Sequence, residues 1–295
     1  MAQPVDADPV GDLAGDFEAA TEQQWLDLVA KVLGDRPVES LTSATADGIE
    51  VRPLYTEGPD ESVTGAPGAA PFTRGFTANQ RDGGRWDLRV FVDGAGGPGC
   101  TTELERGATS LLVGAGALAT QDALRASLAG VHLDLVPVVL AAGSGFTASA
   151  EWLMSLWADS AVGDDSATGG FGADPIGVLA RSGRLPQGIH RALADGAGLA
   201  AMAADRYPRV RTWSVDATPY AEAGASEAQE LAAMLSTAVA YLRSMQDAGM
   251  GADDAAASVE LTLGADADFF TTIAKLRAAR RLMRRWHRHA VWTRR

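Results

Sequence analysis

Beyond about residue 70, strand-like runs alternate with helical runs, and each strand-like run ends in a glycine-rich or turn-forming loop. The run "ATSLLVGAG" precedes the helical "TQDALRASLAG", and "VHLDLVPVVLAAG" precedes "TASAEWLMSLWADSA". Repeated strand, loop and helix of this length indicate a parallel α/β protein, either an open doubly wound sheet or a (β/α)8 barrel. About five such units can be counted, whereas a closed barrel needs eight. A barrel formed by this chain would therefore be incomplete.

In a (β/α)8 barrel, functional groups lie in the loops that follow the strands. Here these loops would be residues 114–116, 141–145, 172–175, 216–224 and 264–268. They are the first places to expect a site.

The first 70 residues have the features of an arm and a linker. Residues 21–33 show the pattern of an amphipathic helix, with Thr21 and Gln24 in a capping-box arrangement. Asp47 and Gly48 separate two short extended segments, which predicts a hairpin. Residues 57–71 have the Gly- and Pro-rich composition of a linker. We expect an N-terminal arm and linker over residues 1–70 and the main α/β domain over residues 71–295.

Composition excludes several classes of function. A hydrophobic content of 46% suffices for a buried core, and a net charge of −13 argues against a nucleic-acid partner. One cysteine, Cys100, and four scattered histidines give neither a disulfide framework nor a Cys/His metal site. The N-terminus lacks a signal-peptide pattern, and no apolar run reaches the ~18 residues of a membrane span. The expected location is the cytoplasm, with no membrane partner.

The C-terminal segment differs electrostatically from the rest of the chain. Residues 277–295 contain eight arginines and no acidic residue. They form either the solvated face and end of a helix or a surface for an acidic partner. The apolar residues of this segment fall on one helical face: Phe269, Ile273, Leu276, Met283 and Trp286.

Two glycine-rich stretches approach the dinucleotide-binding pattern. "GAGGPG", residues 94–99, satisfies G-x-G-x-x-G, but it contains Pro98 and no long helix follows it, so a plain loop is favoured. "GSGFTA", residues 143–148, lies between a buried-type strand and a helix, where backbone N–H groups could hold a phosphate. An ordinary strand-to-helix turn is still the favoured interpretation.

The acidic residues and histidines give no catalytic signature. Asp216, Glu222 and Glu227 cluster around one turn, where the dipole of the following helix stabilises carboxylates without any catalysis. His132 and His190 have no acid or nucleophile partner at motif spacing. P-loop, nucleophile-elbow and metalloprotease signatures are absent from the sequence. Composition and spacing alone therefore define an acidic α/β protein and no particular activity.

Three segments resemble the methylmalonyl-CoA mutase family, and in particular its small, non-catalytic (beta) subunit. They are "PFTRG" with "RWDLRVFVD", "VDATPYAEAGASEAQELAAMLSTAVAYLRSM" and "DFFTTIAKLRAARRLMRRW". The shorter "LERGATSLLV", "LDLVPVVLAAG" and "GADPIG" look like that subunit too, so the resemblance covers nearly the whole chain from about residue 15. It corresponds to the N-terminal part of the subunit.

The resemblance implies a fold and a chemistry. Catalytic members of the family have a (β/α)8 barrel that threads the CoA chain through its centre, followed by a cobalamin domain. Adenosylcobalamin supplies a radical that rearranges methylmalonyl-CoA to succinyl-CoA, while the protein positions the cofactor and shields the radical. The resemblance therefore implies an α/β fold of the (β/α)8 TIM-barrel type, incomplete in this chain, with a helical and extended N-terminal arm.

The catalytic residues of the family have no counterpart here. The active-site tyrosine of catalytic members corresponds to Phe91, which lacks the hydroxyl, and their substrate-binding histidine corresponds to Pro219. Among the family's substrate contacts near Trp86, only Arg89 has a clear match. The resemblance thus implies no catalytic residue and no metal site on this chain, with Arg89 as the one candidate for binding substrate.

Cobalamin binding also has no counterpart. The family uses an Asp-x-His-x-x-Gly motif, and none of His132, His190, His287 or His289 follows an aspartate by two residues. The implied function is therefore that of a small subunit, which pairs with a catalytic large subunit carrying both adenosylcobalamin and the acyl-CoA. Two alternatives remain: an α/β enzyme that binds CoA or another phosphate ligand through "GSGFTA" and Arg89, and a non-functional truncated fragment.

Overall fold

The computed structural model describes residues 18, 20–56, 65–75, 86–94 and 99–292, with side chains up to residue 285. The chain divides into two compact units, Met1–Glu61 and Ser62–Arg295. Across the described residues, no helix is long and apolar enough to cross a membrane.

The first unit contains helix α1 (Glu22–Leu33), the short 3-10 helix η1 (Val38–Leu41) and a hairpin of strands β1 (Ser43–Ala44) and β2 (Glu50–Val51). Both halves of the capping box form, because the Gln24 N–H donates to Thr21 Oγ1 at 3.2 Å and the Thr21 N–H donates to Gln24 Oε1 at 2.8 Å. The helix and the hairpin predicted from the sequence are therefore confirmed.

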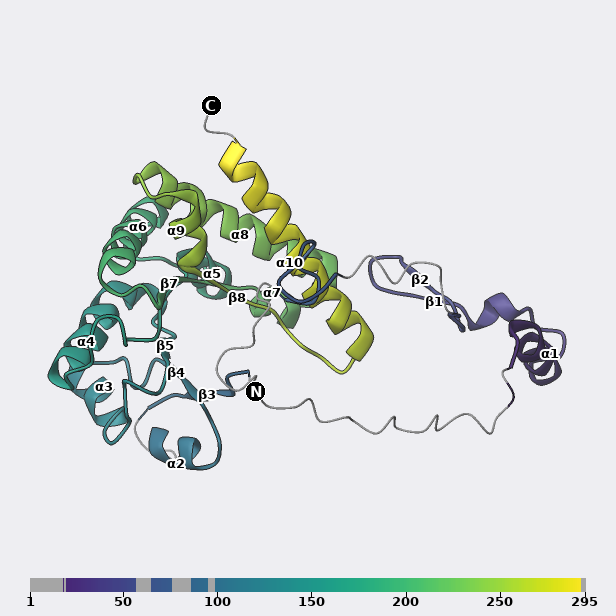
Figure 1. The fold of residues 1–295 in the computed structure, drawn as a ribbon, viewed down its shortest axis with the longest axis horizontal. Helices are drawn as coiled ribbons and strands as arrows, with labels where there is room; N and C mark the ends of the chain where they lie inside the picture. The colour runs from purple at the N-terminus through teal and green to yellow at the C-terminus, as the bar shows by residue number, and fades with distance from the viewer. Residues whose placement is uncertain (1–17, 19, 57–64, 76–85, 95–98, 293–295) are drawn as a thin grey trace, which may run out of the picture. The chain divides into compact units, whose positions relative to one another are not determined.

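The second unit is built on a sheet of six parallel strands in sequential order. They are β3 (Arg89–Val92), β4 (Ser110–Val113), β5 (Val138–Leu140), β6 (Gly169–Ala173), β7 (Val210–Asp216) and β8 (Val259–Thr262). An open doubly wound sheet would reverse its strand order at one point, and this sheet does not. The sheet curls into a half-barrel, which confirms the incomplete (β/α) barrel, with six strands where about five units were expected (Figure 1).

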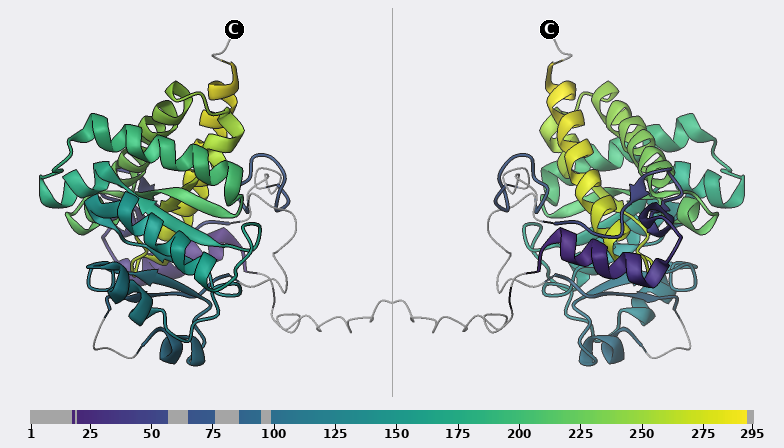
Figure 2. Two further views of the ribbon diagram at one scale, coloured as in Figure 1. Left: turned by 90° about the vertical axis from the view of Figure 1, so that its left-hand side faces the viewer. Right: turned by 90° about the vertical axis from the view of Figure 1, so that its right-hand side faces the viewer.

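Helices link successive strands and cover one face of the curled sheet, leaving the opposite face concave (Figures 1 and 2). In chain order they are α2 (Cys100–Glu105), α3 (Gln121–Ser127), η3 (Gly143–Gly145), α4 (Phe146–Asp159), α5 (Pro175–Ser182), α6 (Ile189–Arg206), α7 (Thr218–Glu222), α8 (Glu227–Asp247), α9 (Ala252–Ala257) and α10 (Phe269–Trp292). The half-barrel thus has its apolar core between sheet and helices.

Aromatic side chains fill this core. Trp213 of β7 stacks on Tyr241 of α8 with ring centroids 4.3 Å apart, and Trp157 of α4 contacts the rings of Phe171 and Tyr207. Gly196 of α6 lies directly against Trp213, so that a Cβ there would be 2.3 Å from the indole ring. The absence of a side chain at this position is what lets α6 approach the sheet.

The buried face of α10 matches the apolar face expected from its sequence only in part. Phe269 and Leu276 are 67% and 38% exposed, whereas Lys275 and Ala279 are buried. Ala279 allows close packing, and Lys275 reaches a buried acid on α8. On another side of α10, Arg280 donates a hydrogen bond to the Thr73 carbonyl at 3.2 Å. Ala278, Leu282 and Met283 also pack against the core, so polar contacts add to an apolar contact of this helix. The side chain of Trp286 lies outside the described residues.

Candidate functional site

The concave face of the half-barrel is the natural place to look for a site, because the helices close off the other face. Side chains alternate along a strand, and Val92, Leu111 and Val113 pack into the core beneath the helices. Arg89 and Phe91 alternate with Val92 along β3, so they lie on the concave face. The register pairs Arg89 with Ser110 and Phe91 with Leu112.

Arg89 joins the first and last strands of the sheet across this face. Its guanidinium forms an ion pair with Glu260 of β8, and its Nε donates to Ser110 Oγ of β4 at 3.0 Å. The Ser110 hydroxyl in turn donates to the Pro137 carbonyl at 3.1 Å. The cationic charge of the predicted substrate-binding residue is thus matched by a carboxylate of the same chain.

Phe91 lies further along β3 and is 57% exposed. Its ring packs over Gly114, where a Cβ would be only 2.6 Å from the ring and from Asp93 Oδ1. Asp93 Oδ1 accepts a hydrogen bond from the Gly116 N–H at 3.2 Å. The glycines of the loop after β4 therefore allow close packing against the end of β3.

Asp174, at the end of β6, is the centre of a polar cluster. It caps α5, accepting from the Gly177 N–H at 3.1 Å, and Oδ1 also accepts from the Tyr241 hydroxyl at 2.6 Å. Arg181 Nη1 lies 3.6 Å from Oδ2, which is buried without a hydrogen-bond partner among the described residues. Burial raises the pKa of Asp174 to about 6, despite the opposing effects of Tyr241, Gly177 and Arg181. Burial also raises the pKa of Tyr241.

The loop after β7 continues this cluster. Asp216 forms an ion pair with Arg181, and its Oδ1 accepts from the Thr218 N–H at 2.9 Å and from the Thr218 hydroxyl at 2.7 Å. Pro219 follows in the first turn of α7, where a missing N–H costs no helix hydrogen bond. The position expected to correspond to the family's histidine therefore belongs to a helix start, beside the ion pair of Asp216 with Arg181. The exposed Glu222 ends the same short helix.

A buried ion pair between α8 and α10 escaped the sequence analysis. Lys275 Nζ donates to Glu230 Oε2 at 2.6 Å, and both residues are almost fully buried. Glu230 Oε1 accepts from the Gly264 N–H at 2.6 Å, and Glu227 Oε1 lies 3.9 Å from Lys275 Nζ. The cluster ties two helices to the loop after β8. A single lysine within an arginine-rich helix was the one sequence signal that could have suggested it.

The described residues of the two glycine-rich stretches show no feature that would bind a ligand. Residues 143–148 connect β5 to α4 as expected, and Gln187 Nε2 donates to the Ser144 carbonyl at 3.1 Å. The stretch contains no lysine or arginine. Most of "GAGGPG" lies outside the described residues, and the helix that follows it has six residues. Within the part of the chain that the structure describes, no three His, Cys, Asp or Glu residues could hold a metal ion.

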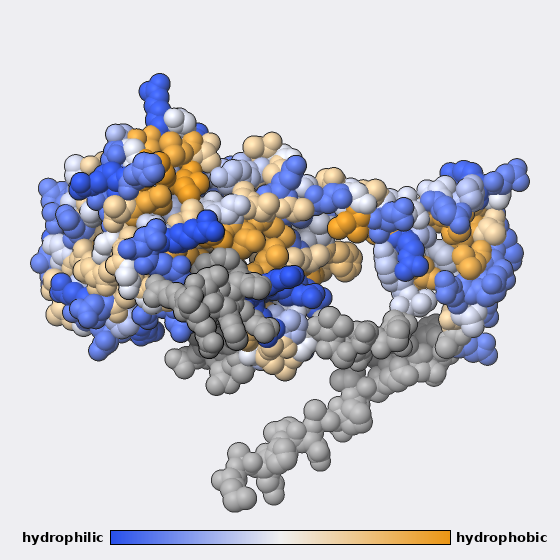
Figure 3. All heavy atoms as spheres, turned by 90° about the horizontal axis from the view of Figure 1, so that it is seen from above, coloured by the Kyte–Doolittle hydropathy of each residue, from blue (hydrophilic) through white to orange (hydrophobic). Residues whose placement is uncertain are grey.

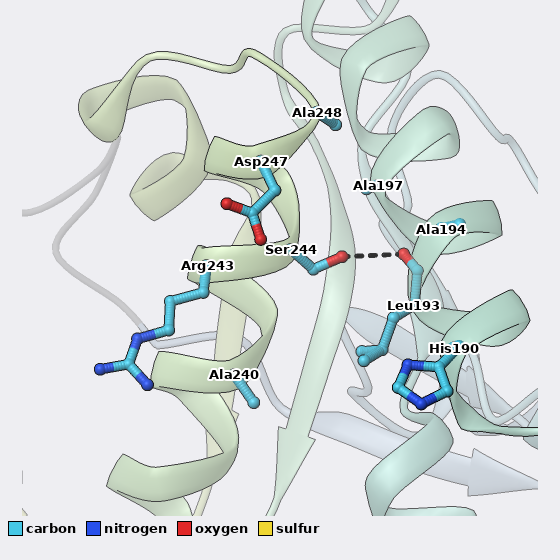
Figure 4. A pocket seen from close by; sticks show the side chains of 9 residues that line it. All are labelled: His190, Leu193, Ala194, Ala197, Ala240, Arg243, Ser244, Asp247 and Ala248. Atoms are coloured by element: carbon cyan, nitrogen blue, oxygen red, sulfur yellow. Dashed lines mark hydrogen bonds between the residues drawn. The ribbon is translucent and has the colours of Figure 1, made fainter.

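A groove of about 520 Å³ lies between α6 and α8, on the helical layer (Figure 4). His190, Arg243 and Asp247 line it with several alanines, and the Ser244 hydroxyl donates across it to the Leu193 carbonyl at 3.0 Å. His190 is the one histidine that lines this groove, and it lies on the helical layer rather than on the concave face. The groove brings none of the residues of the concave face together.

Comparison with known proteins gives consistent matches. A family model described as methylmalonyl-CoA mutase matches residues 112–292. The methylmalonyl-CoA mutase small subunit of Streptomyces virginiae is 43% identical over 287 residues, covering 92% of this chain and 46% of that protein. The small subunit of Propionibacterium freudenreichii subsp. shermanii is 35% identical, covering 91% of this chain and 44% of that protein. The methylmalonyl-CoA mutase of Escherichia coli (strain K12) is 26% identical, covering 88% of this chain and 41% of that protein. The chain spans less than half the length of these curated relatives.

Proposed function

The chain belongs to the methylmalonyl-CoA mutase family, and we propose that it has the role of the small subunit, which pairs with a catalytic large subunit. In this role it supports the adenosylcobalamin-dependent isomerisation of methylmalonyl-CoA to succinyl-CoA without carrying out the reaction itself. The acyl-CoA and the cofactor bind the large subunit, in the cytoplasm.

The ion pair of Arg89 with Glu260 carries this proposal. An arginine that binds substrate must have its guanidinium free to contact an anion. Here the guanidinium of Arg89 already contacts a carboxylate on β8 and a hydroxyl on β4. Phe91 and Pro219 supply neither a proton nor a hydrogen bond where catalytic members have Tyr and His. The concave face is therefore suited to holding the sheet together rather than to binding an acyl-CoA.

The described residues do not fit cobalamin. A histidine that holds a metal ion needs a partner that orients its second ring nitrogen. His132 and His190 lack the family's aspartate two residues earlier, and His190 lies in a groove on the helical layer. In the proposed assembly, the chemistry of that cofactor therefore belongs to the large subunit.

The test is to co-express this chain with a mutase large subunit and to measure the mass of the complex by size-exclusion chromatography with light scattering. A stable one-to-one complex supports the proposal. Mutase activity from this chain alone would contradict it. Cooperative unfolding of the isolated chain would count against a non-functional fragment.

Binding of CoA by this chain is the rival function, through "GSGFTA" and Arg89. Isothermal titration with CoA esters separates the two proposals. The Arg89–Glu260 pair predicts no heat at millimolar ligand, whereas a saturable signal would identify a CoA-binding protein.

A further inference from the structure

Two carboxylates share one guanidinium where strands β6 and β7 end. Charged side chains mostly lie at the surface, as Figure 3 shows over one face of the molecule, whereas Asp174 is only 6% exposed. Arg181 of α5 forms an ion pair with Asp216, and its Nη1 lies 3.6 Å from Asp174 Oδ2. The charges of the three side chains cancel while Asp174 carries a proton. When Asp174 loses the proton, one negative charge is left over.

The two oxygens of Asp174 have different surroundings. Oδ1 accepts hydrogen bonds from the Tyr241 hydroxyl at 2.6 Å and from the Gly177 N–H at 3.1 Å. Oδ2 is buried and has no hydrogen-bond partner among the described residues. A Cβ at Gly177 would be 1.8 Å from this oxygen, so the backbone of α5 lies directly against it. Oδ2 is therefore the oxygen that carries the proton, and the one that needs a cation once the proton has left.

The groups that act on Asp174 come from three elements. Tyr241 on α8 donates a hydrogen bond, Arg181 on α5 supplies positive charge, and Asp216 at the end of β7 supplies negative charge. Strands β5 and β6 and the 3-10 helix η3 have no titratable side chain. The titratable residues of the adjoining helices are the half-buried Tyr220 and the exposed Glu222 on α7, and His190 of α6, which lines the groove.

This environment brings the titration of Asp174 close to neutral pH. Burial is the main cause that raises its pKa to about 6, and the charge of Asp216 acts in the same direction. The hydrogen bonds to Oδ1 and the charge of Arg181 oppose the shift. An ordinary aspartate changes charge near pH 4. Asp174 therefore changes charge where the surrounding acidic residues stay ionised.

Helix α7 depends on ties to its neighbours. It has five residues, none of them buried, and a helix this short is not stable by itself. Asp216 Oδ1 holds its start through the N–H and the hydroxyl of Thr218, and Arg181 in turn holds Asp216 to α5 (Figure 1). Residues 216–224 should therefore loosen when Arg181 leaves Asp216.

We propose that loss of the proton from Asp174 transfers Arg181 from Asp216 to Asp174 and thereby releases residues 216–224 from α5. A shift of roughly 1 Å brings Nη1 into a charge-assisted hydrogen bond with the ionised Oδ2. The same event repels Asp216, because two ionised carboxylates then compete for one guanidinium. The switch acts at the carboxyl ends of the strands, where the loops of (β/α) barrels carry functional groups.

The direction of the switch follows from the shift in the pKa of Asp174. The closed loop keeps Asp174 buried beside Asp216 and holds the proton more tightly than the open loop does. Raising the pH therefore favours opening. The loop is held to α5 below about pH 6 and is released above it.

Hydrogen exchange measured by mass spectrometry tests the proposal on the full chain. Brief labelling at about pH 5 and about pH 7.5, scaled to equal intrinsic exchange, reports openings smaller than global unfolding. We expect the peptide 216–225 to exchange roughly tenfold faster at the higher pH, since complete relief of the shift from 3.8 to about 6 would allow about a hundredfold. Residues 189–206 of α6 are the internal reference and should stay protected at both pH values.

Three variants separate the sensor from the ion pair that it controls. Asp174→Asn has no charge at either pH, so the loop should stay protected at both. Asp216→Asn keeps an oxygen for Thr218 but loses the ion pair with Arg181, so the loop should exchange rapidly at both. Asp164→Asn is the matched control, because Asp164 pairs at the surface with another arginine, and it should respond to pH as the unchanged chain does.

Three results would overturn the inference. Equal protection of residues 216–225 at both pH values in the unchanged chain would mean that Arg181 bridges the two carboxylates throughout. A pH response that persists in Asp174→Asn would assign the response to another titrating group. A response that persists in Asp216→Asn would show that the loop loosens without any transfer of Arg181. This last comparison decides the matter if circular dichroism shows that Asp174→Asn does not fold.

Discussion

Replacing Lys275 by methionine removes the cation from a buried ion pair and should destabilise the second unit. Lys275 is 4% exposed and Glu230 is 1% exposed, with 2.6 Å between Nζ and Oε2. After the substitution, the Glu230 carboxylate keeps only the Gly264 N–H among its described partners. An acidic group would then be buried with no opposite charge beside it.

The size of the effect follows from two opposing terms. At an effective dielectric constant of about 20, two charges 2.6 Å apart attract by about 6 kcal/mol. Desolvating each ion costs several kcal/mol, so the intact pair contributes little net stability. Removing one partner leaves the cost without the attraction, and we expect a loss of about 3–5 kcal/mol in the free energy of unfolding.

The assay is urea unfolding followed by circular dichroism, applied to a double-mutant cycle. Glu230→Gln retains the acceptor for the Gly264 N–H, so the double variant, Glu230→Gln with Lys275→Met, should recover most of the loss. Arg191→Met is the control, because Arg191 pairs with Asp195 on the surface and should matter by roughly 0.5 kcal/mol or less. Additive single effects, or a Lys275→Met loss no larger than that of the control, would refute the reasoning.

Three further outcomes follow from individual contacts. The pKa of Asp174 is raised from 3.8 to about 6, so the native state holds the proton more tightly than the unfolded state does. The free energy of unfolding should therefore fall by about 3 kcal/mol as the pH rises through that interval. Asp174→Asn should abolish this part of the pH dependence, as measured by urea titrations at several pH values. Gly196→Ala forces a methyl group against Trp213 and should cost about 1–3 kcal/mol, whereas Gly198→Ala on the same helix meets nothing within 4 Å and should stabilise by up to about 1 kcal/mol in thermal melts. Thr21→Ala removes a cap worth about 1 kcal/mol, which should speed amide exchange in the helix it caps while leaving the urea midpoint of the second unit unchanged.

The features that sequence predicted are those set by local rules. The capping box of Thr21 and Gln24 involves residues three apart, and the alternation of strands and helices reports the parallel sheet directly. Helix α5, which Asp174 caps and Pro175 begins, was not predicted, although a cap residue followed by proline is a local signal for such a start. Local chemistry was therefore sufficient for most elements and for the parallel α/β class, whereas the choice between an open sheet and a barrel depended on the family resemblance.

The site depends on contacts between residues far apart in the chain, which periodicity does not encode. Glu230 and Lys275 are 45 positions apart, and Asp174 and Tyr241 are 67 apart. Average behaviour places lysine at the surface, so pattern analysis favoured Phe269 and Leu276 as the packed side of α10. The fold buries Lys275 and exposes Phe269 and Leu276, because Glu230 neutralises the buried ammonium and Ala279 permits close packing, while Met283 packs against the core as predicted.

Arg89 gives the sharpest test of whether the concave face supports structure or binds substrate. If the guanidinium holds β3 to β8 through Glu260, Arg89→Met should lower the free energy of unfolding by about 1–3 kcal/mol. Combining Arg89→Met with Glu260→Leu should recover part of that loss, because the double variant has no unpaired charge at this position. The complex with the large subunit should keep its kcat/KM for the acyl-CoA. A raised KM with unchanged stability would instead make Arg89 a substrate ligand, because binding energy alone would then have been lost.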